Sequence, residues 1–329
     1  EEVAYLILNG ELPNKKQLKD FERQERKERN LSKTLLQDIK NFPKKAHPMD
    51  VARTAVSIMG LEDKETKDNS PKANMRKIMR IFAKTPVALA AFYRSRKGKK
   101  IISPKNNLSF SENFFYMCFG KVPNEDIVKA FDVSLILYAE HSFNVSTFTA
   151  RTITSSLSDI HGAITGAIAS LKGPLHGGAN EEVMHMMNKI KKPENALKWI
   201  NKALDNKDVV MGFGHRVYKS GDSRVPTMRE YFSKVAKIKK DKKFEKIYDI
   251  VEKVMIDRKN IHPNVDYPTG PTYHLMGFDT DFFTPIFVIS RITGWSAHII
   301  EQHAANKLIR PLAKYKGNQH RKVVQLNQR

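Results

Sequence analysis

Residues 71–96 read PKANMRKIMRIFAKTPVALAAFYRSR, and this segment gives the clearest indication of the fold class. Pro71 suits the first turn of a helix that we expect to run to about Lys84, and Pro86 suits the start of a second helix running to about Arg96. Helical patterns of the same kind cover residues 1–8, 15–28, 51–59 and 111–139. No βαβ alternation occurs, and the few runs rich in Val and Ile are too short for a main sheet. The sequence therefore predicts an all-α protein.

Length and composition limit the kind of protein this is. The chain has 329 residues, of which 40% are hydrophobic and 28% charged, so it can build a core in about two domains. Its single cysteine, Cys118, excludes a disulfide framework within the chain, which favours a reducing compartment such as the cytoplasm. No apolar run approaches the roughly 18–20 residues that cross a bilayer, so we expect no membrane span. Because a helical pattern already begins at Glu1, we expect the segment to continue from a longer chain.

The charge balance is strongly basic. Lys and Arg number 57 and Asp and Glu 35, which gives a formal net charge of +22 and a field that attracts anions. Nucleic-acid surfaces interleave basic and aromatic residues, but here Lys and Arg are scattered among acids and aromatics make up only 9% of the chain. We therefore expect no nucleic-acid partner. A small polyanionic substrate, a phosphorylated cofactor and a plain solvated surface remain open.

Four turns combine a histidine or an aspartate with Gly, Pro or Asn. Their sequences are EHSFNVS (140–146), GPLHGGAN (173–180), VVMGFGHRVYK (209–219) and HPNVDYP (262–268). In the second turn His176 precedes an expected helix, whose N-terminal positive potential favours a neutral imidazole able to donate to a developing enolate. Structural interpretations remain open as well: His141 as a satisfied core residue, Asp266 as a helix cap, and the second turn as a glycine-rich connection.

The third turn carries groups that favour an anionic ligand. Its Gly-Phe-Gly element allows a ligand to approach the backbone closely, and Arg216 and Lys219 supply charge that attracts phosphate. The turn has neither the third glycine of a dinucleotide fingerprint nor the Lys-Ser/Thr pair of a Walker loop.

Metal and nucleophile chemistry find little support in the sequence. His298 and His303 share one expected helix, but a spacing of five residues places them roughly 140° apart, and the HExxH and HxxEH spacings are missing. Cys118 lies in the apolar run FFYMCF, which is typical of core, and no Gly-x-Ser-x-Gly elbow occurs. We expect no metal ion and no covalent nucleophile.

Taken together, these motifs resemble those of the citrate synthase family, which includes the 2-methylcitrate synthases. The matching pieces follow the family order from the first helix to about Lys316: HPM (47–49), HSFNVSTFTAR (141–151), residues 173–180, residues 212–224, PNVD (263–266), the segment from FTP (283–285) to Trp295, and IRP (309–311). The resemblance implies a two-domain helical fold. A smaller helical domain at residues 178–277 would be inserted into a large domain formed by residues 1–177 and 278–329.

The resemblance also implies roles for individual residues. His176 is similar to the neutral donor that stabilises the enol of the thioester, Asp266 to the base that removes the methyl proton, and His215 to the group that polarises the ketone of oxaloacetate. The oxaloacetate ligands implied in this way are His141, His215, Arg224, Arg291 and Arg310. Arg310 is similar to an arginine that comes from the partner subunit, so the resemblance implies a homodimer.

The coenzyme A site would follow the third turn. The residues that we expect there are Val209, Val210, Gly212, Gly214, Arg216 and Lys219. The resemblance implies no cofactor, because the coenzyme A thioester is itself a substrate.

Three functions remain as hypotheses. The first, favoured by residues 173–176 and 214–219, is citrate synthase, which condenses acetyl-CoA with oxaloacetate and water to give citrate and coenzyme A. The second is 2-methylcitrate synthase, which uses propionyl-CoA. These thioesters differ by one methyl group, and a methylene changes discrimination by only about 1–3 kcal/mol, so a few pocket residues could determine the choice. The third is a non-catalytic nucleic-acid-binding or scaffold protein.

Overall fold

Helices form every named element of the computed structural model, which describes residues 1–218 and 220–329. From the N-terminus they are α1 (Glu2–Asn9), α2 (Lys15–Glu28), α3 (Lys33–Asn41), α4 (Pro48–Glu62), α5 (Pro71–Ser95), α6 (Phe110–Phe119), α7 (Glu125–Tyr138), α8 (Val145–Ser155) and α9 (Ile160–Leu171). They continue with α10 (Ala179–Ile190), α11 (Pro193–Asp205), α12 (Val225–Lys239), α13 (Lys243–Lys259), α14 (Asp266–Met276), η1 (Thr280–Phe282), α15 (Phe283–Ala304) and η2 (Leu326–Gln328). The prediction of an all-α protein is confirmed for these residues.

The helix predicted for residues 15–28 begins and ends at the expected residues. Asn14 accepts hydrogen bonds from the backbone N–H groups of Lys16 at 3.0 Å and Gln17 at 2.9 Å. The Gln17 side chain in turn accepts from the backbone N–H of Asn14 at 2.8 Å. This reciprocal cap satisfies donors that a helix N-terminus otherwise leaves unpaired, so local sequence alone determines where α2 starts.

The prediction of two helices within residues 71–96 is wrong. α5 is one helix, and Pro86 lies in its interior. A proline there removes a backbone hydrogen bond and costs about 3 kcal/mol. From Ile81 to Tyr93, however, nearly every side chain is buried, on all sides of the helix. Because burying one large apolar side chain contributes about 1.5–3 kcal/mol, packing outweighs the local cost of the proline.

The helical pattern predicted to run through residues 111–139 is divided in the structure. α6 ends because Gly120 adopts the left-handed backbone conformation, with φ of 82°, and donates its N–H to the Tyr116 carbonyl. Asn124 then caps α7 by accepting from the backbone N–H of Asp126 at 2.8 Å. The break lets the two helices fold against each other, with the rings of Phe114 and Phe131 stacked 5.7 Å apart.

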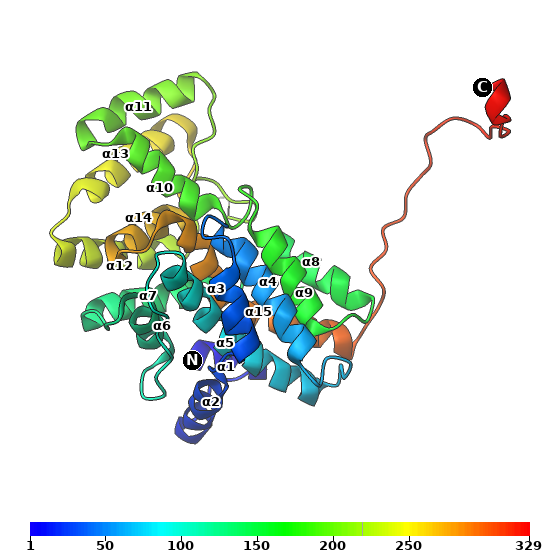
Figure 1. Ribbon diagram of the computed structural model, residues 1–329. Coiled ribbons are helices and arrows are strands. Elements are labelled where there is room, and N and C mark those ends of the chain that lie inside the picture. The colour runs from blue at the N-terminus through cyan, green and yellow to red at the C-terminus, as the bar shows by residue number, and fades with distance from the viewer. Residues whose placement is uncertain (219) are drawn as a thin grey trace.

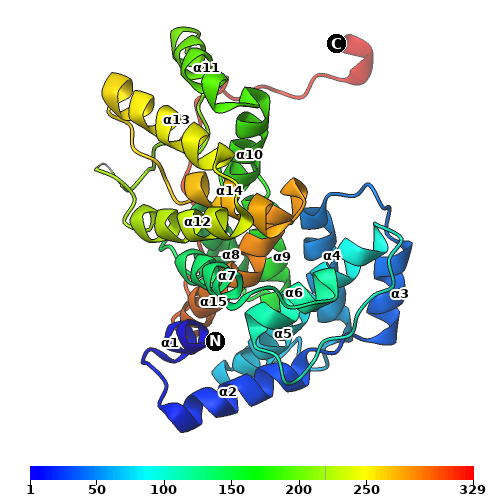
Figure 2. The same ribbon diagram turned by 90° about the vertical axis from the view of Figure 1, so that its left-hand side faces the viewer.

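The long helix α15 runs through the middle of the helical body (Figure 1). It packs against α1, α5, α7, α8 and α9, and its Trp295 is completely buried. Helices α10, α11 and α13 gather at the opposite end of the molecule from α2 (Figure 2). α14 packs against both α10 and α12. α14 and α15 are therefore the elements from which both ends of the molecule can reach a common site.

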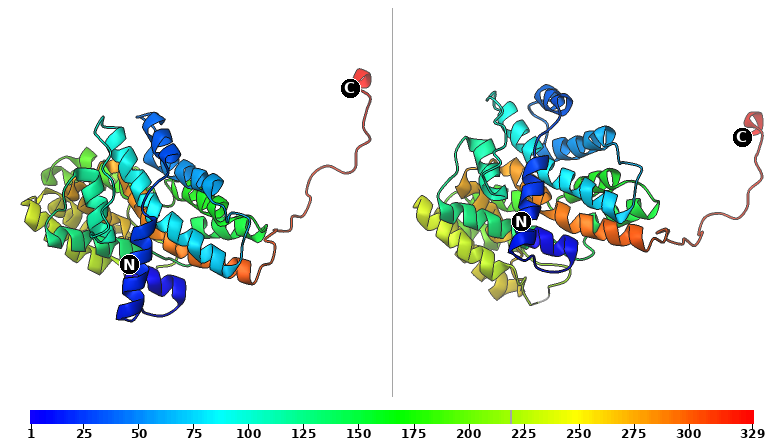
Figure 3. Two further views of the ribbon diagram at one scale, coloured as in Figure 1. Left: turned by 60° about the horizontal axis from the view of Figure 1, so that its bottom comes forward. Right: turned by 90° about the horizontal axis from the view of Figure 1, so that it is seen from below.

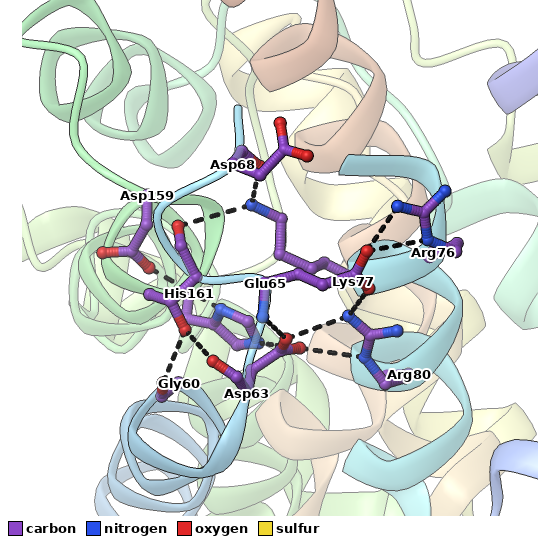
Figure 4. Close-up of polar contacts among 10 residues, drawn as sticks. Gly60, Asp63, Glu65, Asp68, Arg76, Lys77, Arg80, Asp159 and His161 are labelled. Atoms are coloured by element: carbon purple, nitrogen blue, oxygen red, sulfur yellow. Dashed lines mark hydrogen bonds and ion pairs between the residues drawn. The ribbon is translucent and has the colours of Figure 1, made fainter. Parts of the chain in front are cut away.

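A polar cluster braces α5 against the segment that follows α4. Arg80 donates to both carboxylate oxygens of Asp63, at 2.9 and 3.0 Å, and to Glu65 at 2.8 Å. The buried side chain of Lys77 donates from Nζ to the carbonyl of Asp68 at 2.6 Å (Figure 4). The ion pairs of Arg80 and the hydrogen bond from the buried Lys77 to a backbone carbonyl satisfy charged groups that have lost much of their water, so the cluster holds helices together.

After α15 the chain first runs along the end of α8, where the Asn306 side chain donates to the Ser155 carbonyl and the Ile309 backbone N–H donates to the Ser155 hydroxyl, each at 3.0 Å. Almost all side chains of residues 305–329 are exposed, and beyond Ile309 the segment extends away from the other helices in Figures 1 and 3. Arg310 lies on this segment.

Two predictions from composition concern single features. Cys118 is a free, buried cysteine, and burial raises the pKa of its thiol, as the expected core position requires. Among the helices that the structure describes, none is both long enough and apolar enough to cross a membrane.

Candidate active site

One cavity collects most of the side chains that the sequence singled out. It has a volume of about 520 Å³ and lies where the turns before α8, α10 and α14 meet α15. The predicted residues in its wall are His141, His176, Val209, Val210, Gly212, Gly214, His215, Arg216, Arg224, Asp266 and Arg291. Of the remaining two, Lys219 lies outside the described residues, and Arg310 is absent from this wall because it lies on the C-terminal segment.

The turn before α10 holds His176 against Ser146, which lies in the first turn of α8. Nε2 of His176 is 2.8 Å from the Ser146 hydroxyl and accepts from the Ser146 backbone N–H at 3.3 Å. This contact assigns the ring proton to Nδ1, the nitrogen that then remains as a donor. Burial, followed by the positive charge of Arg291, lowers the pKa of His176 to about 4. The ring is therefore neutral near pH 7, and burial rather than the helix N-terminus is the main reason.

Asp266, the first residue of α14, lines the same cavity. The Tyr138 hydroxyl donates to its Oδ1 at 2.5 Å. Burial raises the pKa of Asp266 to about 6, although the hydrogen bond from Tyr138 and the charge of Arg224 act in the opposite direction. At neutral pH the carboxyl is largely ionised, with a pKa close to the working pH, which is the condition that favours a general base.

Two arginines bring positive charge to the cavity. Arg291 is 1% exposed and donates from Nε to the carbonyl of Tyr138 at 2.5 Å. Burial lowers its pKa to about 9, so it remains a cation near neutral pH. Arg224 donates to both oxygens of Asp222, from Nε at 2.9 Å and from Nη2 at 2.7 Å, and this pairing raises its pKa although burial opposes it. Two fixed guanidinium groups of this kind favour a ligand with two carboxylates.

His141 and His215 lie beside each other in the cavity wall, with ring centroids 5.0 Å apart. Nε2 of His141 is 2.9 Å from the hydroxyl of Tyr218. Nδ1 of His215 accepts from the backbone N–H of Val217 at 3.1 Å, so its proton belongs on Nε2. Burial, followed by Arg224, lowers the pKa of His141 to about 4, and the same two causes lower the pKa of His215. Both rings are neutral near pH 7.

Backbone pairing joins the loop that carries His215 to the loop that precedes Asp266. The N–H of Gly214 donates to the carbonyl of His262, and the N–H of Asn264 donates to the carbonyl of Gly212, each at 2.9 Å. A β-bridge between the intervening residues lies at the same place. These bonds hold the two loops side by side, next to the residues that carry the imidazole and the carboxylate.

Glycine is required at position 212 because neighbouring side chains of the protein leave no room for a Cβ atom. Its φ is 86°, and a Cβ atom there would lie 2.7 Å from Val183 and 2.9 Å from Tyr267. Gly214 also has a positive φ, 77°, but the nearest atom to its Cβ position, in Ile261, is 3.6 Å away. Of the two glycines, only Gly214 leaves room of the kind that the sequence predicted for a ligand.

The remaining predicted residues of the third turn differ in burial. Val210 is buried, whereas Val209 and Arg216 line the cavity but are exposed to solvent. The cavity is therefore open on this side, and a ligand longer than the cavity could leave it past Val209 and Arg216.

The two histidines of α15 contact different partners. Nε2 of His298 is 3.1 Å from a carboxylate oxygen of Glu140, whereas Nε2 of His303 is 3.0 Å from the carbonyl of Ser158. Within residues 1–218 and 220–329, no group of three or more His, Cys, Asp or Glu side chains is arranged to hold a metal ion.

Known proteins share this architecture along nearly the whole chain. The family model described as the C-terminal domain of citrate synthase matches residues 1–312. The chain is 52% identical to 2-methylcitrate synthase 2 of Corynebacterium glutamicum in a match that covers 100% of this chain and 87% of that protein. The chain belongs to the citrate synthase family. It is thus an enzyme of the acyltransferase type.

Other members of the citrate synthase family are similarly close. The citrate synthase of Mycolicibacterium smegmatis is 49% identical over 324 residues, which cover 98% of this chain and 86% of that protein. A solved ternary complex of carboxymethyl coenzyme A and oxaloacetate with the citrate synthase of Thermoplasma acidophilum has a TM-score of 0.93 and 32% identity, covering 99% of this chain and 87% of that one.

Sequence analysis did not identify four residues that contact the predicted site residues of this citrate synthase family member. Tyr138 lines the cavity itself, and Ser146, Asp222 and Tyr218 lie behind its wall, each bonded to a predicted site residue. Ser146 and Tyr218 lie within two of the four turns, so polar side chains near each histidine were the available signal. Tyr138 gave no such signal, because it ends an apolar helix.

Proposed function

We propose that the chain condenses acetyl-CoA with oxaloacetate and water to give citrate and coenzyme A. The observation that carries this proposal is that Asp266 and the neutral His176 line one cavity together with the buried Arg291 and the half-buried Arg224, which is paired with Asp222. A thioester methyl group is a very weak acid, so a carboxylate removes its proton at a useful rate only if the developing oxyanion is stabilised at the same time. A base and a neutral donor in one cavity supply both requirements.

In the first step Asp266 accepts a methyl proton from acetyl-CoA, and the electron pair of the C–H bond moves toward the thioester oxygen. His176 donates a hydrogen bond from Nδ1 to that oxygen. The resulting enolate, stabilised by that hydrogen bond, holds the nucleophilic carbon, and Asp266 holds the proton.

In the second step the enolate carbon attacks the ketone of oxaloacetate. His215, whose proton lies on Nε2, donates a hydrogen bond to the ketone oxygen and stabilises the negative charge that develops there as the carbon-carbon bond forms; the proton taken up by Asp266 balances that charge. His141, Arg224 and Arg291 bind the carboxylates and keep the ketone in line for attack. Water then hydrolyses the citryl thioester to citrate and coenzyme A, and no cofactor takes part.

The open side of the cavity is where we place coenzyme A. Its expected contacts are Val209, Val210, Gly212, Gly214, Arg216 and Lys219. We also propose that residues 178–277 form a small domain that closes on residues 1–177 and 278–329 after oxaloacetate binds. Closure would keep water away from the thioester until the carbon-carbon bond has formed.

Arg310 completes the site only in a homodimer under this proposal. Arg310 is exposed and follows α15, outside the wall of its own chain's cavity, which suits a residue that reaches a second copy. We further place the enzyme in the cytoplasm, with small-molecule substrates and no nucleic-acid or membrane partner.

The choice of thioester is tested by steady-state kinetics. 2-Methylcitrate synthase, which uses propionyl-CoA, is the alternative, and it is supported by the name of the Corynebacterium relative. We expect thiol release with oxaloacetate to give a higher kcat/KM for acetyl-CoA than for propionyl-CoA. A preference for propionyl-CoA would instead establish the alternative. Retention on DNA that weakens with salt, without thiol release from either thioester, would contradict both.

A further inference from the structure

Tyr138 is a completely buried residue that joins two parts of the cavity wall. It is the last residue of α7, and its ring lies against Phe287 of α15, with centroids 4.0 Å apart. Arg291, one helical turn beyond Phe287, has its guanidinium carbon 4.7 Å from the centre of the same ring. The aromatic ring of Tyr138 is therefore fixed by packing, which leaves its hydroxyl little freedom of position.

The polar groups of Tyr138 contact the two charged residues that the proposed reaction needs most. Its hydroxyl donates to Oδ1 of Asp266 at 2.5 Å, and its backbone carbonyl accepts from Nε of Arg291 at 2.5 Å. Among residues 1–218 and 220–329, no side-chain or backbone donor pairs with the other carboxylate oxygen, Oδ2. Oδ2 is thus the oxygen available to a ligand in the cavity that Asp266 lines.

A second contact holds α7 against α14 one helical turn earlier. The hydroxyl of Ser134 in α7 lies 2.8 Å from the hydroxyl of Tyr273 in α14. Because Ser134 and Tyr138 are four residues apart, they lie on the same face of α7. The register between α7 and α14 is therefore set at two points, of which only one touches Asp266.

We propose that Tyr138 is a positioning residue for the catalytic base: its hydroxyl holds Oδ1 of Asp266 and thereby presents Oδ2 to the substrate. This inference rests on the proposed function, since it concerns the base of that reaction. A hydrogen bond to one oxygen restricts rotation of the carboxylate and stabilises its ionised form.

The groups around Asp266 predict in which direction its pKa moves when the hydroxyl of Tyr138 is removed. Burial favours the protonated carboxyl, and Asp222 adds repulsion, whereas the hydroxyl of Tyr138 and the charges of Arg224 and Arg291 favour the carboxylate. Burial also raises the pKa of Tyr138, so its hydroxyl stays protonated and able to donate. Removing that hydroxyl must therefore raise the pKa of Asp266 above its value of about 6.

The test compares Tyr138→Phe with Tyr273→Phe. Both changes remove one hydroxyl from a fully buried tyrosine at the same helix interface, but only the first hydroxyl touches Asp266. In Tyr138→Phe we expect the acid limb of the pH profile of kcat/KM to move upward by about one pH unit. Activity should recover in part above pH 8, where Asp266 is ionised again, a recovery that general structural damage would not produce. Tyr273→Phe should leave the limb unchanged.

A second readout is independent of turnover. In protein labelled with carboxyl-¹³C aspartate, the Asp266 resonance is assigned by its loss in Asp266→Asn, and its titration gives the pKa of the free enzyme. An increase in this pKa in Tyr138→Phe alone supports the proposal, and an unchanged pKa overturns it. If the pKa rises but the wild-type chain condenses neither thioester with oxaloacetate, the proposed function is the part that fails.

Discussion

At the scale of single residues, Asp266 has to remain ionised after most of its water has been removed. Burial raises its pKa to about 6, and two arginines and one tyrosine keep it from rising further. The same cavity keeps His176 neutral, because burial and nearby positive charge lower the pKa of that ring to about 4. Opposite shifts in two groups of one cavity produce a base and a neutral donor at one pH.

Replacing the base should separate chemistry from binding. In Asp266→Asn we expect kcat to fall about a thousandfold, because an amide cannot accept the methyl proton. The affinity for oxaloacetate, measured by calorimetry, should change little, since the base contacts the other substrate. Loss of oxaloacetate binding in a folded Asp266→Asn protein would contradict the assigned role.

Replacing Arg291 should impair the binding of oxaloacetate, which the replacement of Asp266 should leave almost unchanged. In Arg291→Leu we expect oxaloacetate binding to weaken by about 2–5 kcal/mol, because a substrate carboxylate is left without its buried partner. Arg291→Lys retains the charge and should recover part of the affinity. Thermal unfolding of both variants identifies any loss of fold. Unchanged affinity in folded Arg291→Leu would mean that the anion site lies elsewhere.

The sequence made the charged and imidazole groups of the cavity predictable, but not the groups that orient them. His141, His176, His215 and Asp266 each lie in a turn rich in Gly, Pro or Asn, where a reactive side chain stands out. Tyr138 is 128 residues from Asp266 in the chain, and their contact depends on how α7 packs against α14. No local pattern can show such a contact.

At the scale of elements, the local sequence predicted helix boundaries correctly where solvent exposure or a capping side chain determines where a helix begins. The helix predicted for residues 15–28 begins where it was expected, and in the structure the reciprocal cap of Asn14 and Gln17 fixes that start. Pro86 led to a wrong prediction because the preference of proline for the first turn of a helix is a local effect. In α5 the side chains around Pro86 are buried on nearly all sides, and their packing outweighs that preference. Tertiary packing, which the sequence does not display locally, determined the course of α5.

Gly212, which lies where the two loops of the cavity pair, provides a prediction at the scale of elements. Gly212 and Gly10 both have a positive φ, 86° and 84°, but only at Gly212 would a Cβ atom overlap neighbours. Both alanine variants should lose about 1–2 kcal/mol of unfolding free energy from backbone strain. Gly212→Ala should lose a further 1–3 kcal/mol, approximately, from overpacking against Val183 and Tyr267. Urea unfolding measures both, and equal losses would contradict the packing explanation.

At the scale of the whole molecule, the cavity draws its residues from distant parts of the chain. Arg291 comes from α15 in the middle of the helical body, whereas His215 and Arg224 come from the segment between α11 and α12. The all-α class followed from periodicity alone, but the meeting of these segments in one cavity could be expected only from the family resemblance.

The role of Arg310 can be tested with hybrid dimers. Asp266→Asn and Arg310→Ala chains carrying different tags are co-expressed, and the dimers that hold one of each are purified. If Arg310 serves the partner's cavity, one of the two sites in each hybrid is intact, and about half of the wild-type activity should return. Hybrids as inactive as the two parent variants would show that Arg310 serves its own chain.

The most direct test of the central claim is a double-mutant cycle on kcat for Asp266→Asn and His176→Ala, with wild type and both single variants assayed together. If the carboxylate and the imidazole act on one thioester in a single step, each change alone should cost about a thousandfold, and the double variant should lose little more than the worse single one. Losses that multiply, to about a millionfold in the double variant, would mean that the two groups act independently and would contradict the account.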